Sequence, residues 1–177
     1  MKSSVQIIAP TVSPCGFSEA EIFGMMVWLW MHSETRQGAP IRALSSLMLP
    51  VIKNQQYVLL TDHSQPIAYM AWAELSPEME AAYLQHSNAL KTPEDWRSGD
   101  RYWITDWIAP FGHTRELLHA IRNRLFPNRL WRGLYHKGNQ TGLKVKTFHG
   151  IAIHPLEAQH WFNTNPIHTQ PYPTSGV

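Results

Sequence analysis

The chain has 177 residues, of which 44% are hydrophobic and 16% are charged, and its formal net charge is +2. This length lies in the range of one compact domain, and the high apolar content, which includes eight tryptophans, excludes an intrinsically disordered chain. The nearly balanced charge does not indicate a general nucleic-acid-binding surface.

The cysteine count and the apolar runs bear on the cellular compartment. The only cysteine, Cys15, excludes an intramolecular disulfide framework and suits a reducing cytoplasm. The apolar stretch from Val5 to Ala9 is too short for the core of a signal peptide, and no run reaches membrane-spanning length. The sequence contains no HExxH motif, paired cysteines or close histidine pair. We therefore expect a cytoplasmic protein without a metal site.

The first predicted element is a helix over residues 18–33, preceded by an N-terminal leader over residues 1–16. Ser18 and Glu21 have the spacing of a capping box, in which each side chain accepts a hydrogen bond from the other residue's backbone. Apolar residues then recur at helical spacing from Ile22 to Leu29.

Helices and strands interleave along the rest of the chain. In chain order the sequence predicts a helix over 41–52, strands over 56–61 and 66–73 joined by a polar turn, a helix near 78–86, a strand over 102–108, a helix over about 114–125, strands near 130–135 and 143–148, and a short helix near 155–163. This order is typical of an α/β (α+β) fold with a mixed central sheet flanked by helices. We expect one domain over residues 17–163 and a flexible, Pro-rich tail over 164–177.

The segment Gly99 to Gly112, GDRYWITDWIAPFG, places the carboxylate of Asp106 within an apolar, aromatic run. On a strand, Asp106 shares its face with Ile104 and Ile108. Removing an ionised carboxylate from water costs several kcal/mol, so Asp106 should be paired, hydrogen-bonded to backbone amides, or shifted in pKa. It is either a structural acid that holds the following Ala-Pro-Phe-Gly turn or a functional group.

Several motifs share their order and spacing with one enzyme family. They are Trp28-Leu29-Trp30, Pro40, the strands Gln56 to Thr61 and Pro66 to Ala73, Glu94-Asp95-Trp96, Ser98 to Arg101, Asp106 to Gly112, Lys144-Val145 and Phe148-His149-Gly150. Over roughly residues 20–152 the chain resembles the toxin-activating lysine acyltransferases that modify RTX cytolysins.

The resemblance implies a fold similar to that of the GNAT acyltransferases and a defined activity. Such an enzyme takes a fatty acyl group from acyl carrier protein, needs no bound cofactor, and forms an amide on an internal lysine of an RTX-type protoxin, which activates the toxin. The implied catalytic pair is a histidine and the aspartate that Asp106 matches. Counting without gaps places the histidine position at Arg36, and His32 lies four residues earlier. His32 would therefore serve as the shifted base.

The chemistry requires such a base. A lysine amine has a pKa of about 10.4, so few molecules are nucleophilic at pH 7, whereas an imidazole can accept the proton. We expect His32 and Asp106 to form the catalytic pair, with Ser33 and Arg36 in supporting roles, Arg36 holding a carboxylate or phosphate. Backbone amides of the Ala109 to Gly112 turn are candidate donors to the thioester oxyanion. His113 and His149 are reserve bases.

Basic residues concentrate late in the chain and fit an acidic partner such as acyl carrier protein. They are Arg115, Arg122, Arg124, Arg129, Arg132, Lys137, Lys144 and Lys146, against the single acid Glu116. We expect contacts with the acyl donor at Arg132, Lys137 and Lys144. The alternative is a solvated basic face without a partner.

Other readings of the function remain open. With Arg36 in place of the base, the chain could be a degenerate family member that binds acyl carrier protein or protoxin without transfer. The acceptor could also be a bacteriocin. The content of exposed aromatic residues predicts a homodimer.

Overall fold

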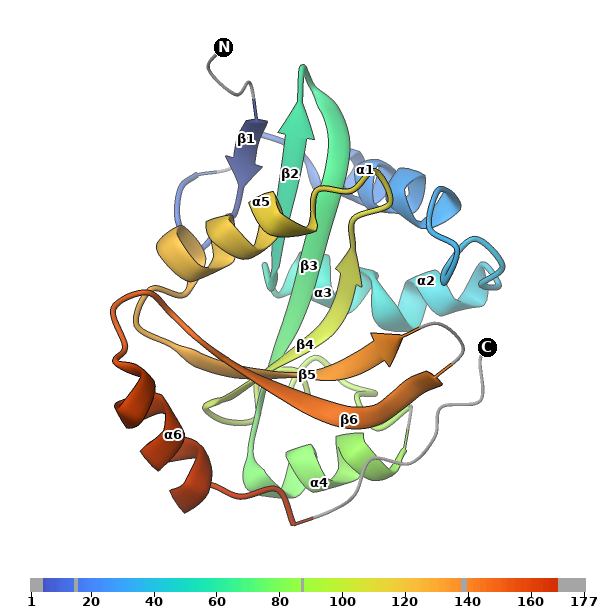
Figure 1. Cartoon of the computed structure of the whole chain (residues 1–177). Helices are drawn as coiled ribbons and strands as arrows, with labels where there is room; N and C mark the ends of the chain where they lie inside the picture. The colour runs from blue at the N-terminus through green and yellow to red at the C-terminus, as the bar shows by residue number, and fades with distance from the viewer. Residues whose placement is uncertain (1–4, 15, 87, 138–139, 169–177) are drawn as a thin grey trace. The chain divides into compact units, whose positions relative to one another are not determined.

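The computed structural model describes residues 5–14, 16–86, 88–137 and 140–168 (Figure 1). The chain divides into two compact units. The first consists of Met1–Trp72 and Asp106–Leu125, and the second of Ala73–Thr105 and Phe126–Val177. Cys15 and the predicted tail from residue 169 onward lie outside the described residues.

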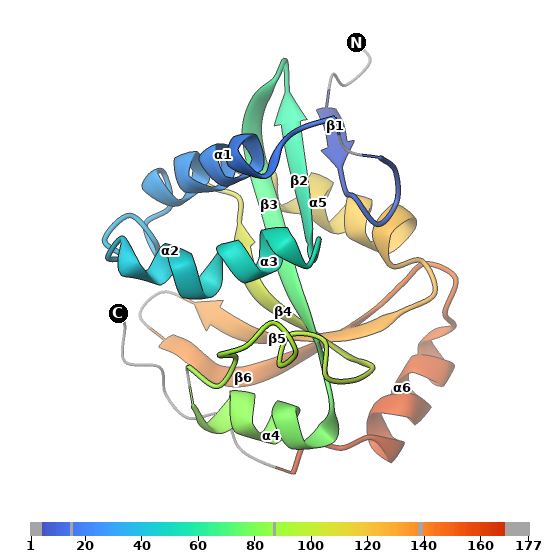
Figure 2. The ribbon, with the colours of Figure 1, turned by 180° about the vertical axis from the view of Figure 1, so that it is seen from behind.

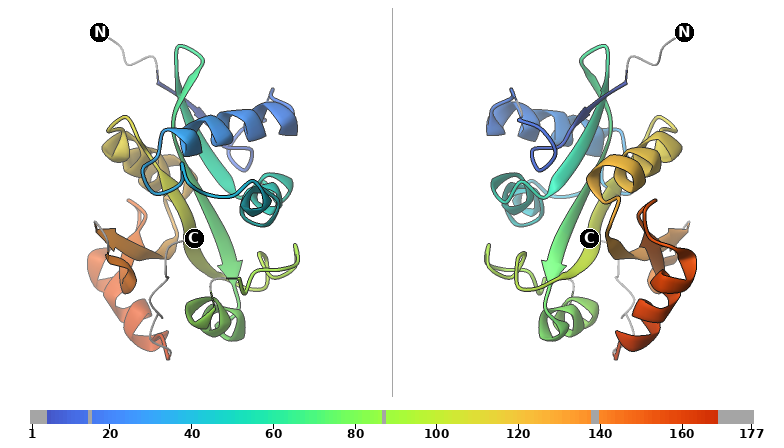
Figure 3. Two further views of the ribbon diagram at one scale, coloured as in Figure 1. Left: turned by 90° about the vertical axis from the view of Figure 1, so that its right-hand side faces the viewer. Right: turned by 90° about the vertical axis from the view of Figure 1, so that its left-hand side faces the viewer.

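The first unit packs helices on both faces of its strands. Its elements are β1 (Val5–Ile8), α1 (Glu19–Met31), α2 (Arg42–Leu47), α3 (Leu49–Lys53), β2 (Tyr57–Asp62), most of β3 (Gln65–Leu75), the end of β4 (Arg101–Ile108), α5 (Thr114–Ala120) and the π-helix η1 (Ile121–Leu125). Strand β2 pairs antiparallel with both β1 and β3. Helices α1 and α3 cover one face of these strands and α5 covers the other (Figures 2 and 3).

The second unit contains the end of β3 and most of β4. Its other elements are α4 (Pro77–Gln85), β5 (Leu130–Lys137), β6 (Gln140–His149) and α6 (Pro155–Thr164). Strands β4 and β5 are parallel, whereas β5 and β6 are antiparallel. Helix α6 packs against β6 (Figure 1).

The strand pairing confirms the predicted fold class. The strands follow the order β1-β2-β3-β4-β5-β6, with a parallel pair among antiparallel ones, so the sheet is mixed. Helices flank it, and this architecture is consistent with a GNAT-like acyltransferase fold. Among the described residues, no helix is long and apolar enough to cross a membrane.

The start of α1 follows the local sequence signal. The backbone N–H of Ser18 donates to Glu21 Oε2 at 2.7 Å, and the N–H of Glu21 donates to Ser18 Oγ at 3.3 Å. The predicted capping box is therefore confirmed. The polar turn between β2 and β3 is confirmed too, with positive φ angles at His63 and Ser64.

Two predictions of secondary structure are wrong. The helix predicted over 41–52 is two short helices, α2 and α3, which meet at Met48. Pro50 stands in the first turn of α3, and because proline has no backbone N–H it cannot donate the hydrogen bond to the preceding turn that one continuous helix would need. Strand β1 lies in the segment expected to be only a leader. Its four residues carry little local signal, and it forms by pairing with β2.

Candidate active site

Asp106 lies near the end of β4 and divides its two carboxylate oxygens between different partners. Oδ1 accepts hydrogen bonds from Arg36 Nε at 3.3 Å and Nη2 at 3.1 Å. Oδ2 accepts from Trp30 Nε1 at 3.0 Å and from the hydroxyl of Tyr69. The expectation that a carboxylate in this apolar run is paired is thus confirmed.

Trp30 and Tyr69 hold Asp106 from the buried side. Trp30 lies in the last turn of α1 and Tyr69 in the middle of β3, and both side chains are buried. The indole N–H of Trp30 also hydrogen-bonds to the Tyr69 hydroxyl. Burial, followed by the negative charge of Asp106, raises the pKa of Tyr69 well above its usual value. The hydroxyl therefore keeps its proton and donates a hydrogen bond to the carboxylate.

Arg36 approaches Asp106 from the turn that follows α1. The backbone N–H groups of Arg36 and Gln37 donate to the carbonyl of Ser33 at 3.0 and 2.8 Å, and the Arg36 guanidinium lies 4.9 Å from the centre of the Trp30 ring. Ser33 is buried, and its hydroxyl lies 3.0 Å from that of Thr35, so Ser33 supports this turn. The ungapped count along the sequence therefore gives the residue that contacts Asp106.

His32 has a different set of contacts. Its ring is exposed at the C-terminal end of α1, with Nδ1 2.8 Å from the carbonyl oxygen of Trp28. Ring centroids lie 4.4 Å apart for Trp28 and His32 and 5.4 Å apart for His32 and Phe111. A carbonyl only accepts hydrogen bonds, so a neutral His32 carries its proton on Nδ1 and its lone pair on Nε2.

These contacts correct the arrangement expected for the candidate pair. The group that orients the His32 ring is a main-chain carbonyl, whereas the Asp106 carboxylate is directed at Arg36, Trp30 and Tyr69. The physical reason is that α1 ends at Met31, so residues 32 and 36 do not follow one another on a continuous helix. The catalytic roles of His32 and Asp106 stay predictions.

The turn after β4 places Phe111 beside His32. Gly112 has φ +86°, which an L side chain rarely adopts, and its N–H donates to the carbonyl of Ala109 at 3.3 Å. The N–H of Gly112 is therefore already used within the turn. The role of the turn's other backbone amides as donors to the thioester oxyanion stays a prediction. Of the reserve bases, His113 follows the turn directly, with Nδ1 buried and without a hydrogen bond among the described residues.

The three predicted donor contacts lie in or beside the β5 and β6 strands of the second unit. Arg132 is buried, and its Nη1 lies 2.7 Å from Glu80 Oε1. Lys144 is exposed on β6. The side chain of Lys137, the last residue of β5, lies outside the described part of the chain. Their contact with an acyl donor stays a prediction.

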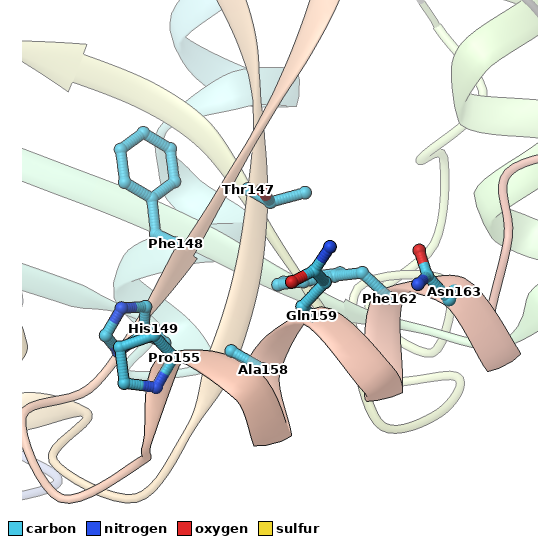
Figure 4. A pocket seen from close by; sticks show the side chains of 8 residues that line it. All are labelled: Thr147, Phe148, His149, Pro155, Ala158, Gln159, Phe162 and Asn163. Carbon is cyan, nitrogen blue, oxygen red and sulfur yellow. The ribbon is translucent and has the colours of Figure 1, made fainter.

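His149, the second reserve base, lines a groove between β6 and α6. The cavity measures about 300 Å³, and Figure 4 shows β6 side chains on one side and α6 side chains on the other. Its lining is mostly neutral and consists of Thr147, Phe148, His149, Pro155, Ala158, Gln159, Phe162 and Asn163. His149 Nδ1 lies 3.0 Å from the carbonyl oxygen of Gly150.

Sequence reasoning missed two sets of residues. Trp30 and Tyr69 were part of recognised motifs, but nothing local indicates that they bond to Asp106. The buried cluster of Glu80, Arg101 and Arg132 was missed as well. Glu80 is one of two acidic residues in the first turn of the short helix α4, and a charged side chain is usually expected on the surface.

The mixed sheet with its flanking helices is consistent with the class of GNAT-like acyltransferases. Residues 16–149 match the RTX toxin acyltransferase family, and the chain belongs to this family.

Several curated relatives are similar over most of their length. The leukotoxin-activating lysine-acyltransferase LktC serotype A1 of Mannheimia haemolytica is 39% identical over 145 residues, which cover 81% of this chain and 85% of the relative. The protein-lysine myristoyltransferase RtxC of Kingella kingae is 42% identical over 134 residues, covering 76% and 77%. The protein-lysine myristoyltransferase HlyC of Escherichia coli is 42% identical over 133 residues, covering 75% and 77%.

Proposed function

We propose that this protein transfers a fatty acyl chain from acyl carrier protein to the ε-amine of a lysine in an RTX-type protoxin. The observation that carries the proposal is the similarity to relatives whose names state lysine acyl transfer and, for two of them, myristoyl transfer. The family match spans the residues from before α1 to the end of β6, which include the whole Asp106 site.

The reaction is an attack of the neutral lysine amine on the thioester carbonyl. The nitrogen–carbon bond forms, the carbon–sulfur bond breaks, and the products are an amide and the thiol of the carrier. We assign the proton lost by the amine to Nε2 of His32, from which it passes to the leaving thiolate. A positioned base of this kind contributes about 10² to 10⁴-fold to the rate.

Asp106 and Arg36 position this base indirectly, by holding the backbone segment that carries it. Their ion pair ties the turn after α1 to the end of β4, so it fixes the two segments that carry His32 and Phe111. Ser33 stabilises the same turn. We further propose a cytoplasmic reaction, a donor contact that includes Lys144, and a homodimer, in line with the sequence.

A direct test combines purified protein, acyl-loaded carrier protein and a lysine-bearing protoxin fragment, and measures the intact mass of the fragment. We expect the fragment to gain acyl groups that resist hydroxylamine, since an amide resists it and a thioester does not. A matched fragment with its acceptor lysines changed to arginine should gain none.

One observation favours a second candidate, a binding protein without transfer activity. Arg36 occupies Oδ1 of Asp106, and an arginine cannot serve as a base because it stays protonated. In this case the protein would bind the loaded carrier while the mass of the fragment stays constant. That result would contradict the proposed transfer.

A further inference from the structure

Three large apolar side chains, two in contact with the His32 ring and one on the residue before it, remain partly exposed. Trp28 is 42% exposed, Met31 65% and Phe111 41%. Trp28 and Met31 precede His32 by four and one residues, and Trp28 and Phe111 both contact its ring. We call these three residues the apolar collar. Clustered exposed apolar side chains commonly mark a binding site.

We propose that the apolar collar binds the part of the acyl chain that lies next to the reacting carbonyl. This inference rests on the proposed function and adds a binding site for a saturated hydrocarbon chain to it. At the moment of transfer the amine must lie within roughly 3 to 3.5 Å of the carbonyl carbon. The base must lie within hydrogen-bond reach of the same amine.

These two distances fix where the chain begins. The first methylene groups are bonded to the carbonyl carbon, so they lie only a few ångströms from the imidazole of His32. The side chains that contact this imidazole are Trp28 and Phe111. The chain therefore meets apolar surface as soon as it leaves the carbonyl.

The chemistry of the collar suits this ligand. None of its side chains is charged, and the nearby charges of Arg36 and Asp106 are paired with one another. Met31 is unbranched and adapts to irregular apolar shapes. Each methylene group that the collar buries should improve binding of the acyl chain by about fourfold.

One hollow of the first unit lies too far from His32 to hold these methylenes. It is lined by Phe17, Glu19, Ile22 and neighbouring residues at the start of α1. His32 follows the end of this 13-residue helix, which is about 20 Å long. A chain whose carbonyl lies at His32 begins at the collar and not in that hollow.

The test compares kcat/KM for carriers loaded with acetyl, hexanoyl and myristoyl groups. Acetyl has no methylene and hexanoyl has four, so the wild-type protein should prefer hexanoyl over acetyl by at least about tenfold. Met31→Ala and Phe111→Ala should each lower this preference by about fourfold or more. Phe111→Leu, which keeps an apolar side chain, should preserve most of it.

Two controls separate the collar from general damage. Ile41→Ala changes an 86% exposed residue of the first unit outside the collar and should leave the hexanoyl to acetyl ratio unchanged. The myristoyl to hexanoyl ratio should also stay constant in every variant, because the additional methylenes lie beyond the collar. Thermal unfolding of each variant checks that it is folded.

The outcomes distinguish this inference from the proposed function. Equal kcat/KM for acetyl and hexanoyl in the wild type, or an unchanged ratio in both alanine variants, would overturn the collar. Transfer of no acyl group at all would overturn the proposed function instead. In that event the affinities of the acetyl and hexanoyl carriers are measured without acceptor. The ratio of these two affinities, in the wild type and in the alanine variants, then tests the collar in the same way as the ratio of kcat/KM values.

Discussion

Two carboxylates, Asp106 in the first unit and Glu80 in the second, form the same kind of cluster. Each accepts a hydrogen bond from an indole N–H, Trp30 to Asp106 at 3.0 Å and Trp103 to Glu80 at 2.7 Å. Each also forms an ion pair with arginine, through one guanidinium at Asp106 and through two at Glu80.

The clusters differ in their access to water. The side chains of Glu80 and Arg132 are each 3% exposed, whereas those of Asp106 and Arg36 are 13% and 30% exposed. Desolvation lowers the pKa of Arg132, although the charge of Glu80 opposes this effect. Similar groups thus make a closed structural cluster in one unit and an open cluster beside a candidate base in the other.

The largest effect on stability is expected where the cluster is closed. Glu80→Gln removes the negative charge between two arginines and should lower the free energy of unfolding by about 3 to 5 kcal/mol, the cost of breaking a buried ion pair. Denaturant titration measures this change. A loss below about 1 kcal/mol would mean that the cluster is not closed to water.

Asp106→Asn should have a smaller effect on stability and a clear effect on activity. It weakens one ion pair and the hydrogen bonds to Oδ2, which costs about 1 to 3 kcal/mol. Transfer by the folded variant should slow because the turn that carries Arg36 loses its anchor. Denaturant titration and acylation rates of the same preparation test both points. If Asp106→Asn lost more stability than Glu80→Gln, the contrast between an open and a closed cluster would be contradicted.

A double variant sharpens the role of the open cluster. Oδ1 of Asp106 faces residue 36, and a carboxylate can orient an imidazole that acts as a base. Adding Arg36→His to His32→Ala should therefore restore transfer by at least about tenfold over His32→Ala alone. Intact mass of the acceptor measures the rates. The rescue should vanish when Asp106→Asn is added, and a rescue that persists would contradict the role of Oδ1.

The smallest effect concerns alkaline pH. The raised pKa of Tyr69 means that the folded protein keeps this proton where the unfolded chain, with a value near 10.0, loses it. Stability should therefore fall as the pH rises above about 10. Tyr69→Phe removes this contribution, so its free energy of unfolding should decline less steeply between about pH 9 and 11. Equal slopes for both proteins would show that Tyr69 ionises normally.

The sequence predicted features that depend on neighbouring residues. The capping box of Ser18 and Glu21, the polar turn between β2 and β3, and the need of Asp106 for a partner all follow from local chemistry. The fold class followed from the order of elements and from the family resemblance.

Features that depend on distant residues could not be predicted in this way. Tyr69 reaches Asp106 across 37 positions, and Arg132 reaches Glu80 across 52. Arg132 therefore read as a surface cation although it is buried. Helix α1 ends at Met31, so His32 and Arg36 do not share one helical face. A sequence pattern locates a helix end only to within one or two residues, so this end could not be predicted.

We assign His32, beside the open cluster, as the base of lysine acyl transfer. The most direct measurement is the rate of acylation of a lysine-bearing protoxin fragment, read by intact mass, for wild type, His32→Ala and the matched variant Arg36→Ala. We expect His32→Ala to slow transfer by about 10² to 10⁴-fold, whereas Arg36→Ala, which loses the anchoring ion pair but keeps the base, should slow it by less than about tenfold. Equal rates for wild type and His32→Ala would contradict this assignment.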